Sequence, residues 1–267
     1  MQKRYYNSNF SKISNDGKKF LEKGYIVKKV ENLDSLNFFK KNINQTISSE
    51  IGSNINLNSF HKKINKDNLN SVRLKIIKKI NSEKYKELNS KQHYFRIASE
   101  GIKDIVGTEI AMQNEISLSI QMPKDKSSLL PLHSDTWSGN SPFEVVLWVP
   151  LVDCYSTKSM FILENKNINN FEKLYKKNFN KTSDHLFNSV RKYLKFIDIK
   201  YGEYMIFNQN LPHGNIVNQT NETRWSMNCR FKGLFSPYVN KKLGEVFTPI
   251  TISPSSIAGI NYKYPKT

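Results

Sequence analysis

The spacing of hydrophobic residues in this sequence changes near Thr108, and this change constrains the fold more than any other feature. Before it, apolar residues recur every three or four positions, as on one face of a helix. They are Leu36, Phe39, Ile43 and Ile47 in one segment, and Leu69, Val72, Ile76 and Ile80 in the next. After it, residues 116–122 alternate between apolar and polar, which is typical of a half-buried strand. The sequence therefore predicts helices in the first hundred residues and strands in the rest.

Short strands separated by turns are expected throughout the second half. The segments that favour strands are 144–151, 159–163, 203–207, 213–217 and 223–232. Many short strands of this kind indicate a jelly roll or a barrel. Helices gathered before them indicate that the barrel has a helical backing. The predicted class is a β-rich α+β fold.

The chain is predicted to form one domain over residues 1–267, because it contains no internal repeat and no clear linker. Residues 1–107 would form the mainly helical part, and residues 108–232 the jelly-roll core. A segment rich in Asn and Lys, at about 165–196, is expected to be a helical insertion in that core. Residues 233–267 form a C-terminal tail to which the sequence assigns no role.

Cysteine usage and hydropathy bear on the compartment. Cys154 and Cys229 lie far apart and do not form a disulfide framework, which fits a reducing cytoplasm. The basic residues near the start are not followed by the apolar region of a secretory signal. No stretch approaches the roughly 18 apolar residues that a membrane span needs. A cytoplasmic location without a membrane partner is therefore expected.

The net charge is +18, from 41 Lys and Arg against 23 Asp and Glu. Such a charge can favour nucleic acid. However, the lysines are scattered over helical segments, as at Lys62-Lys63 and Lys78-Lys79, in the manner of solvated faces. The chain also has no dense basic and aromatic segment for gripping a nucleic-acid strand. Nucleic acid is therefore not the expected partner, whereas the positive surface favours an anionic substrate, such as one carrying phosphate.

His133 and Asp135 are predicted to bind one metal ion together with the remote His213. On an extended segment, residues two apart face the same side, so both side chains reach one ion. Two imidazoles and one carboxylate leave coordination positions open, which favours iron(II) that must also bind a co-substrate and oxygen. A structural zinc would want four closed ligands, usually with Cys. Gly214 is expected to let the backbone approach a ligand closely.

Polar residues alternate with apolar ones in 223–231, so that Arg224, Ser226, Asn228 and Arg230 share one strand face. Two arginines on an inward face are costly unless an anion pairs with them. The C5 carboxylate of 2-oxoglutarate is a natural partner for Arg224, whose planar fork binds a carboxylate bidentately. The Ser226 hydroxyl can add a bond, and Arg230 is the second candidate for this anchor.

The segments 132–136, 144–153, 157–160 and 213–224, together with 20–27, carry a family resemblance. They resemble the phytanoyl-CoA-hydroxylase-like branch of the iron(II)- and 2-oxoglutarate-dependent oxygenases. Within it they are similar to a bacterial group found among carbohydrate-biosynthesis genes. The resemblance covers about residues 20–232. It implies a cupin-like double-stranded β-helix, with iron on His133, Asp135 and His213 and 2-oxoglutarate on Arg224.

The resemblance also implies an enzyme that uses molecular oxygen to hydroxylate a sugar or sugar conjugate. Trp137, just past Asp135, is a candidate for stacking on that sugar, and Arg230 is a candidate substrate contact. Trp148, on a predicted strand, could line the substrate cavity, but core packing is its expected role. Two alternatives remain open. Nucleic-acid demethylases of the superfamily also carry paired arginines, and a jelly-roll carbohydrate-binding module could retain the fold without catalysis.

Overall fold

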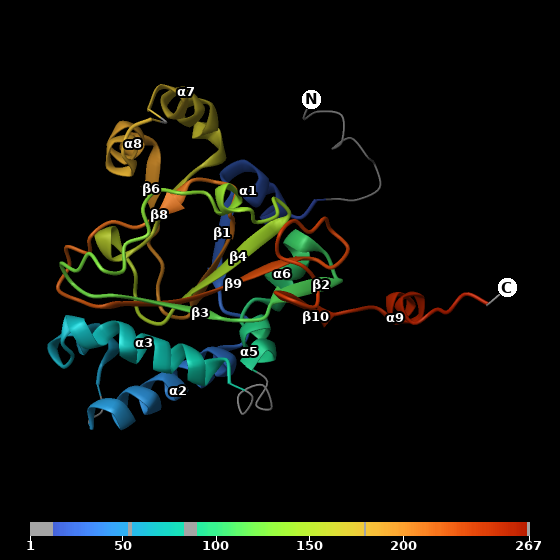
Figure 1. Ribbon diagram of the computed structural model, residues 1–267, viewed down its shortest axis with the longest axis horizontal. Coiled ribbons are helices and arrows are strands. Elements are labelled where there is room, and N and C mark those ends of the chain that lie inside the picture. Colours follow the sequence, from blue (N-terminus) through green and yellow to red (C-terminus); the bar gives the residue numbers. More distant parts are fainter. Residues whose placement is uncertain (1–12, 53–54, 83–89, 179, 266–267) are drawn as a thin grey trace.

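The computed structural model describes residues 13–52, 55–82, 90–178 and 180–265, and its strands form two antiparallel sheets (Figure 1). The larger sheet has seven strands in the order β1-β7-β4-β9-β2-β10, with β3 also paired to β9; the smaller has the order β6-β5-β8. The strands are β1 (Tyr25–Lys29), β2 (Ile110–Gln113), β3 (Ser117–Gln121), β4 (Glu144–Pro150), β5 (Phe161–Leu163), β6 (Leu194–Phe196), β7 (Glu203–Asn208), β8 (His213–Gly214), β9 (Arg224–Gly233) and β10 (Phe247–Thr251). Two antiparallel sheets backed by helices are compatible with the predicted jelly roll.

The N-terminal helices confirm the predicted apolar stripes. The helices of this part are α1 (Asn15–Lys23), α2 (Leu33–Ile51), α3 (Lys66–Ile80), α5 (Ser90–Arg96) and α6 (Ser99–Val106). Both stripes, on α2 and α3, are buried in the main hydrophobic core. Figure 1 shows α2, α3 and α5 together beside β3, and α3 contacts that strand directly. The first helix begins at the cap Ser14 and ends at Gly24, whose φ of 87° suits glycine.

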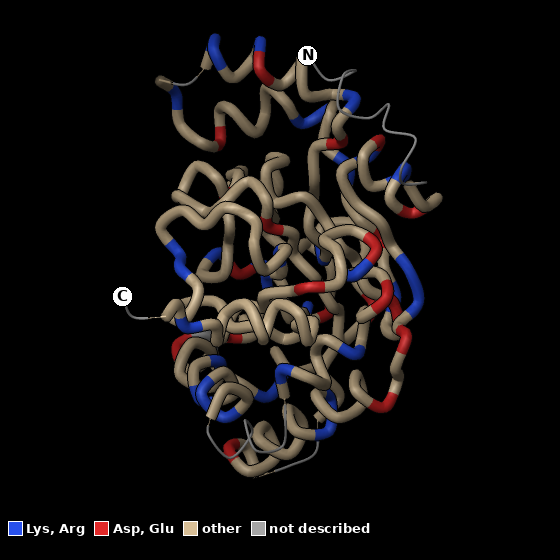
Figure 2. Tube along the Cα trace, turned by 90° about the vertical axis from the view of Figure 1, so that its right-hand side faces the viewer, with Lys and Arg blue, Asp and Glu red and all other residues tan. Residues whose placement is uncertain are grey.

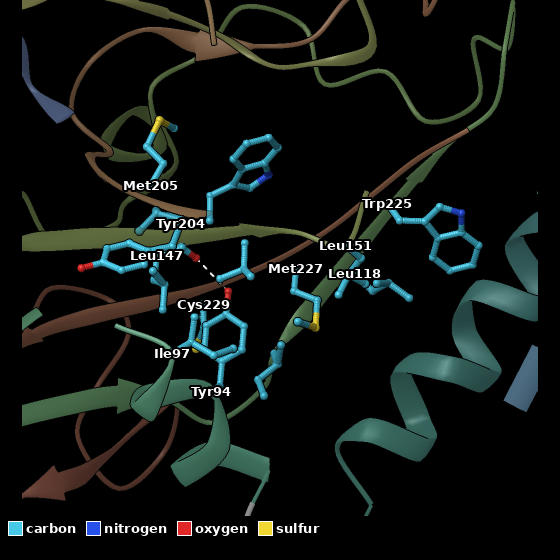
Figure 3. Packing of buried hydrophobic residues seen from close by; sticks show 14 of the residues in the cluster. Tyr94, Ile97, Leu118, Leu147, Leu151, Tyr204, Met205, Trp225, Met227 and Cys229 are labelled. Carbon is cyan, nitrogen blue, oxygen red and sulfur yellow. Dashed lines mark hydrogen bonds between the residues drawn. The ribbon is translucent and has the colours of Figure 1, made fainter. Parts of the chain in front are cut away.

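β9 is the central strand of the large sheet, paired with β4 on one side and with β2 and β3 on the other. Its two faces differ as the alternation predicts. Met227 and Cys229 are buried, and Figure 3 shows them in the core beside Leu147 of β4. The opposite face carries the polar row that begins with Arg224. This strand therefore separates the apolar core from the polar site.

The segment predicted as a helical insertion contains α7 (Ile168–Asn178) and α8 (Ser183–Val190), and then β6. A second hydrophobic cluster packs these helices against the smaller sheet. It consists of Leu132, Phe161, Leu163, Phe171, Leu186 and Val190. Because Leu132 belongs to it, the insertion holds the chain directly before His133. The single-domain organisation stays a prediction.

The C-terminal segment, to which the sequence assigned no role, supplies the edge strand β10. Its Phe247 is completely buried and packs with Ala111 and Leu234. Pro249 weakens the strand signal in the sequence, and the register with β2 is irregular between Pro249 and Thr251. An edge strand tolerates such a proline, because one of its sides has no ladder to complete. Beyond it, α9 (Pro254–Ile260) extends away from the sheets (Figure 1).

Strand β8 is shorter than the predicted 213–217. After Gly214 the chain leaves the strand and contacts the loop that precedes His133: the Asn215 amide oxygen accepts a hydrogen bond from the Leu130 N–H at 2.8 Å.

Among the helices of the described ranges, none has both the length and the apolar character of a membrane span.

Replacing Phe247 by alanine tests the role of the C-terminal strand. Phe247→Ala should lower the free energy of unfolding by about 3–5 kcal/mol, because it removes a buried ring and leaves a cavity. Urea denaturation followed by circular dichroism measures this loss. Phe235→Ala is the control, since that ring is 64% exposed. Equal stability of the two variants would show that β10 does not contribute to the folded core.

Candidate functional site

A backbone bridge brings the two histidines of the predicted metal site together. The His133 N–H donates to the His213 carbonyl at 3.0 Å, and the His213 N–H donates to the His133 carbonyl at 2.8 Å. The two rings consequently lie side by side, with centroids 4.4 Å apart. Ser134 has extended backbone angles, so Asp135 faces the same side as His133. One ligand atom from each of His133, Asp135 and His213 lies within 4.8 Å of the other two.

The ring orientations fit a shared cation. Nδ1 of His133 lies 2.7 Å from the Pro131 carbonyl oxygen, and Nδ1 of His213 lies 2.8 Å from the Leu211 carbonyl oxygen. A carbonyl only accepts hydrogen bonds, so each Nδ1 carries the proton. Each Nε2 lies near Asp135 Oδ1, at 3.4 Å for His133 and 4.0 Å for His213; it donates to that oxygen when protonated and offers a lone pair to a metal when neutral. Three such donors with open positions beside them fit a divalent transition metal.

The protonation states also suit metal binding. Burial lowers the pKa of His213 to about 4, so this imidazole is neutral at physiological pH. Burial opposes ionisation of Asp135, but the hydrogen bond with His133 and the Arg230 guanidinium outweigh it, and they hold the pKa of the carboxyl well below its usual value. The hydrogen bond to Asp135 raises the pKa of His133. His133 is therefore the ligand at which protons compete most with a metal.

Arg230 orients the carboxylate ligand. Its Nη2 donates to Asp135 Oδ2 at 2.7 Å, which leaves Oδ1 turned towards the histidines. Its Nε donates to Gln209 Oε1 at 2.9 Å, and Gln209 Nε2 in turn donates to the buried Glu144 at 2.9 Å. The sequence predicted a substrate contact for Arg230 and missed both Gln209 and Glu144. Arg230 also lines the cavity, so the substrate contact stays a prediction.

Arg224 is 3% exposed and has an incomplete set of partners. Its Nη2 donates to Ser119 Oγ at 2.8 Å. Within the described residues, Arg224 Nε and the hydroxyl of Ser226 have no hydrogen-bond partner, and no carboxylate pairs with this guanidinium. Burial lowers the pKa of Arg224, which reflects the cost of an uncompensated buried cation. A carboxylate placed here would bind both unpartnered groups, so the residues fit the co-substrate.

The metal-binding residues and Arg224 line one cavity of about 750 Å³. The polar face of β9 forms one wall, and the apolar side chains Val146, Trp148, Met160 and Phe207 form another part. Residues of α3, of β3, of the loop 127–130 and of the segment 213–215 also line the cavity. Trp148, which was expected in the core, is buried but also contributes to this wall. The volume is in the range of pockets that hold small molecules.

Trp137 and Gly214 each make contacts that the sequence did not predict. Trp137 is 49% exposed, lies against Phe171 and Tyr175 of α7, and is not among the residues that line the cavity. It follows Asp135 within a 3-10 turn (η3, Asp135–Ser138), where residues two apart point in different directions.

A Cβ on Gly214 would lie 2.6 Å from the Leu130 carbonyl oxygen. This glycine therefore permits close packing of two protein segments; it also lines the cavity, so its predicted role towards a ligand stays a prediction.

Comparisons with known proteins place the chain by its fold. No family model and no curated protein matches this sequence. A solved structure of EctD from S. alaskensis, with 2-oxoglutarate and 5-hydroxyectoine, is similar at 15% identity and a TM-score of 0.55, over 86% of this chain and 80% of that one. The nickel complex of the non-heme monooxygenase ThoJ gives 12% identity and a TM-score of 0.51, over 88% and 83%.

A third solved structure, HygX from Streptomyces hygroscopicus with nickel and 2-oxoglutarate bound, gives 12% identity and a TM-score of 0.52, over 84% of this chain and 88% of that one. At these identities the similarity shows a shared fold. The predicted mixture of helices and antiparallel sheets is thereby confirmed, and it is the fold of structures that hold a metal and 2-oxoglutarate.

Metal binding should weaken as the pH falls. The metal needs the free Nε2 of His133, whose pKa is raised, whereas Asp135 stays ionised throughout. Below the pKa of His133, the apparent dissociation constant for Ni(II) should rise by about tenfold per pH unit, because one proton is displaced. Calorimetric titration between about pH 5 and about pH 8 measures this slope. A His185→Ala variant should show the same profile, and an affinity independent of pH would contradict the assignment of His133.

Proposed function

We propose that this protein is an iron(II)- and 2-oxoglutarate-dependent oxygenase that oxidises a small molecule. The observation that carries this proposal is the buried Arg224, with its unpartnered Nε beside the unpartnered Ser226 hydroxyl, in the same cavity as His133, Asp135 and His213. A metal site alone fits many functions. A metal site that shares a cavity with an uncompensated buried arginine fits a metal enzyme with an anionic co-substrate.

Each residue has a distinct role in the proposed reaction. His133 Nε2, Asp135 Oδ1 and His213 Nε2 would hold iron(II), and Arg224 with Ser226 would bind the distal carboxylate of 2-oxoglutarate. Bound iron and 2-oxoglutarate supply the oxidising chemistry, in which oxygen is consumed and the co-substrate is converted to succinate and carbon dioxide. The protein supplies orientation of these groups and apolar walls that limit water in the cavity.

Arg230 keeps the metal-binding carboxylate in position. By binding Oδ2 of Asp135 it favours ligation through Oδ1 alone, which leaves other coordination positions free. Such neighbours of metal ligands typically change metal affinity or activity by about 10–100-fold when they are removed. The neutral amides of Gln209 and Gln113 complete its hydrogen bonds without adding charge.

The substrate class is proposed to be a sugar or sugar conjugate, and the chain is proposed to belong to the phytanoyl-CoA-hydroxylase-like branch. The support is the sequence resemblance, together with a cavity wall that combines Trp148 with polar Asn228 and Asn215. Aromatic faces and amides are the groups that commonly bind sugars. A cytoplasmic location is part of the proposal, since Cys154 and Cys229 are both free and buried.

The two alternative functions have less support. A nucleic-acid demethylase would use both arginines of β9, but the Arg230 guanidinium is engaged by Asp135. Figure 2 shows Lys and Arg distributed around the periphery with acidic residues among them, which differs from a basic stripe for a nucleic-acid strand. A non-catalytic binding module would have no need of a buried, unpaired arginine beside three converging metal ligands.

Substitution of the co-substrate anchor tests the proposed function. Arg224→Lys should raise the KM for 2-oxoglutarate by about tenfold or more, because lysine keeps the charge and loses the bidentate fork. Fe(II) affinity should stay unchanged, whereas His133→Ala should abolish iron-dependent succinate formation. Arg96→Lys, at an exposed position, is the matched control. If Arg224→Lys loses iron before it loses 2-oxoglutarate, the anchor is wrongly assigned.

A comparison of substrates tests the finer proposal. Succinate release above the uncoupled background should be stimulated by members of a nucleotide-sugar panel, and not by methylated oligonucleotides. Succinate can be quantified by chromatography after equal incubation of wild-type protein and the inactive His133→Ala variant. Stimulation by the oligonucleotides alone would overturn the sugar assignment and favour the demethylase.

A further inference from the structure

A third arginine, Arg73, lines the cavity from the side of α3. The charged residues of the lining, apart from histidine, are Arg73, Arg224, Arg230 and the single carboxylate Asp135. Arg230 is paired with Asp135, and Arg224 is assigned to the co-substrate in the proposed function. Arg73 is the member of this set for which neither the described part of the chain nor the co-substrate provides an anion.

The contacts of Arg73 orient its side chain without neutralising it. Its Nε and Nη2 donate to Asn70 Oδ1, at 3.2 Å and 2.8 Å, and Asn70 lies one turn earlier on α3. That amide is uncharged and also lines the cavity. Within the described ranges no carboxylate lies at ion-pair distance from Arg73. The guanidinium keeps further N–H donors available, because an arginine carries five.

The loop 127–130 places a hydroxyl group without a hydrogen-bond partner among the residues that line the cavity. The Ser128 hydroxyl is buried, and no hydrogen-bond partner for it exists among the described residues. The loop is fixed by Asn215, two residues past His213: its Nδ2 donates to the Ser128 carbonyl at 3.4 Å, and its backbone N–H donates to the Leu130 carbonyl at 2.9 Å. The position of Ser128 is thus tied to the strand that carries a metal ligand.

We propose that Arg73 binds an anionic group of the substrate, a carboxylate or a phosphate, and that the Ser128 hydroxyl, which belongs to the same cavity lining, donates a hydrogen bond to that group. This inference rests on the proposed function, which assigns the other anionic ligand to Arg224. An arginine matches both groups, because its fork presents parallel N–H donors to two oxygens. Arg73 is then a specificity-determining residue: it selects anionic molecules and fixes the end of the substrate that does not react.

The test measures anion binding to the full-length protein, loaded with Ni(II) and saturating 2-oxoglutarate so that Arg224 is occupied and no turnover occurs. Thermal unfolding is followed against inorganic phosphate and, separately, acetate, with ionic strength held constant by chloride. The proteins are wild type, Arg73→Ala, Arg73→Lys and Lys78→Ala. Lys78 is an exposed cation on the same helix and is not part of the cavity lining, so its loss controls for net charge.

Wild type and Lys78→Ala should show a saturable rise of Tm with at least one of the two anions. Arg73→Ala should weaken the apparent affinity for that anion by about tenfold or more, as expected for loss of a charge-assisted hydrogen bond. Arg73→Lys should lie between them. A larger rise of Tm with phosphate would identify the bound group as a phosphate, and a larger rise with acetate would identify it as a carboxylate. A wild type without a saturable response to either anion, or an unchanged response in Arg73→Ala, would overturn the inference.

A 2-oxoglutarate titration of the same four proteins separates this inference from the proposed function. All four should bind 2-oxoglutarate equally when Ni(II) is present. Failure of the wild type to bind it would refute the proposed function, while the comparison of Arg73→Ala with Lys78→Ala would still report on the anion site. Loss of 2-oxoglutarate binding in Arg73→Ala alone would make Arg73 the co-substrate anchor and would overturn the inference.

Discussion

The backbone bridge between His133 and His213 is the interaction on which the site depends. Its two hydrogen bonds join the loop between β3 and β4 to a two-residue strand eighty positions after His133. The bridge sets the spacing of the two imidazoles, while the Pro131 and Leu211 carbonyls set their tautomers. Because Gly214 has no side chain, the Leu130–Pro131 segment can lie against it. The metal-binding geometry is thus a consequence of how two backbone segments pack.

Buried charge organises the rest of the cavity. Asp135 is compensated by Arg230, and hydrogen bonds through Gln209 link this pair to Glu144. Removing one partner of such a buried pair typically costs about 3–5 kcal/mol, because the other charge is left uncompensated. Arg224 has no equivalent partner among the residues that the structure describes. The two arginines share one strand face but differ in role: Arg230 positions a metal-binding residue, whereas Arg224 has donors available for a ligand.

Local patterns predicted much of this structure. The helical stripes of α2 and α3 and the alternation of β9 follow from periodicity, which is set by neighbouring residues. The extended conformation of Ser134 is likewise local, and it places His133 and Asp135 on one side. The sequence could not show that Arg230 binds Asp135, because the two are brought together by separate elements. Nor could it show that a tight turn directs Trp137 towards α7, that Phe247 completes a sheet edge, or that α3 delivers Arg73 to the cavity. Each of these depends on contacts between residues distant in the chain.

A crystal structure of the protein loaded with Ni(II) and 2-oxoglutarate would test the central claim most directly. The account predicts anomalous density at roughly 2.0–2.2 Å from Nε2 of both histidines and from Oδ1 of Asp135. It also predicts the distal carboxylate of 2-oxoglutarate on Arg224 and Ser226. A metal bound away from His133, Asp135 and His213, or a 2-oxoglutarate molecule held by another arginine while Arg224 keeps its present contacts, would contradict it.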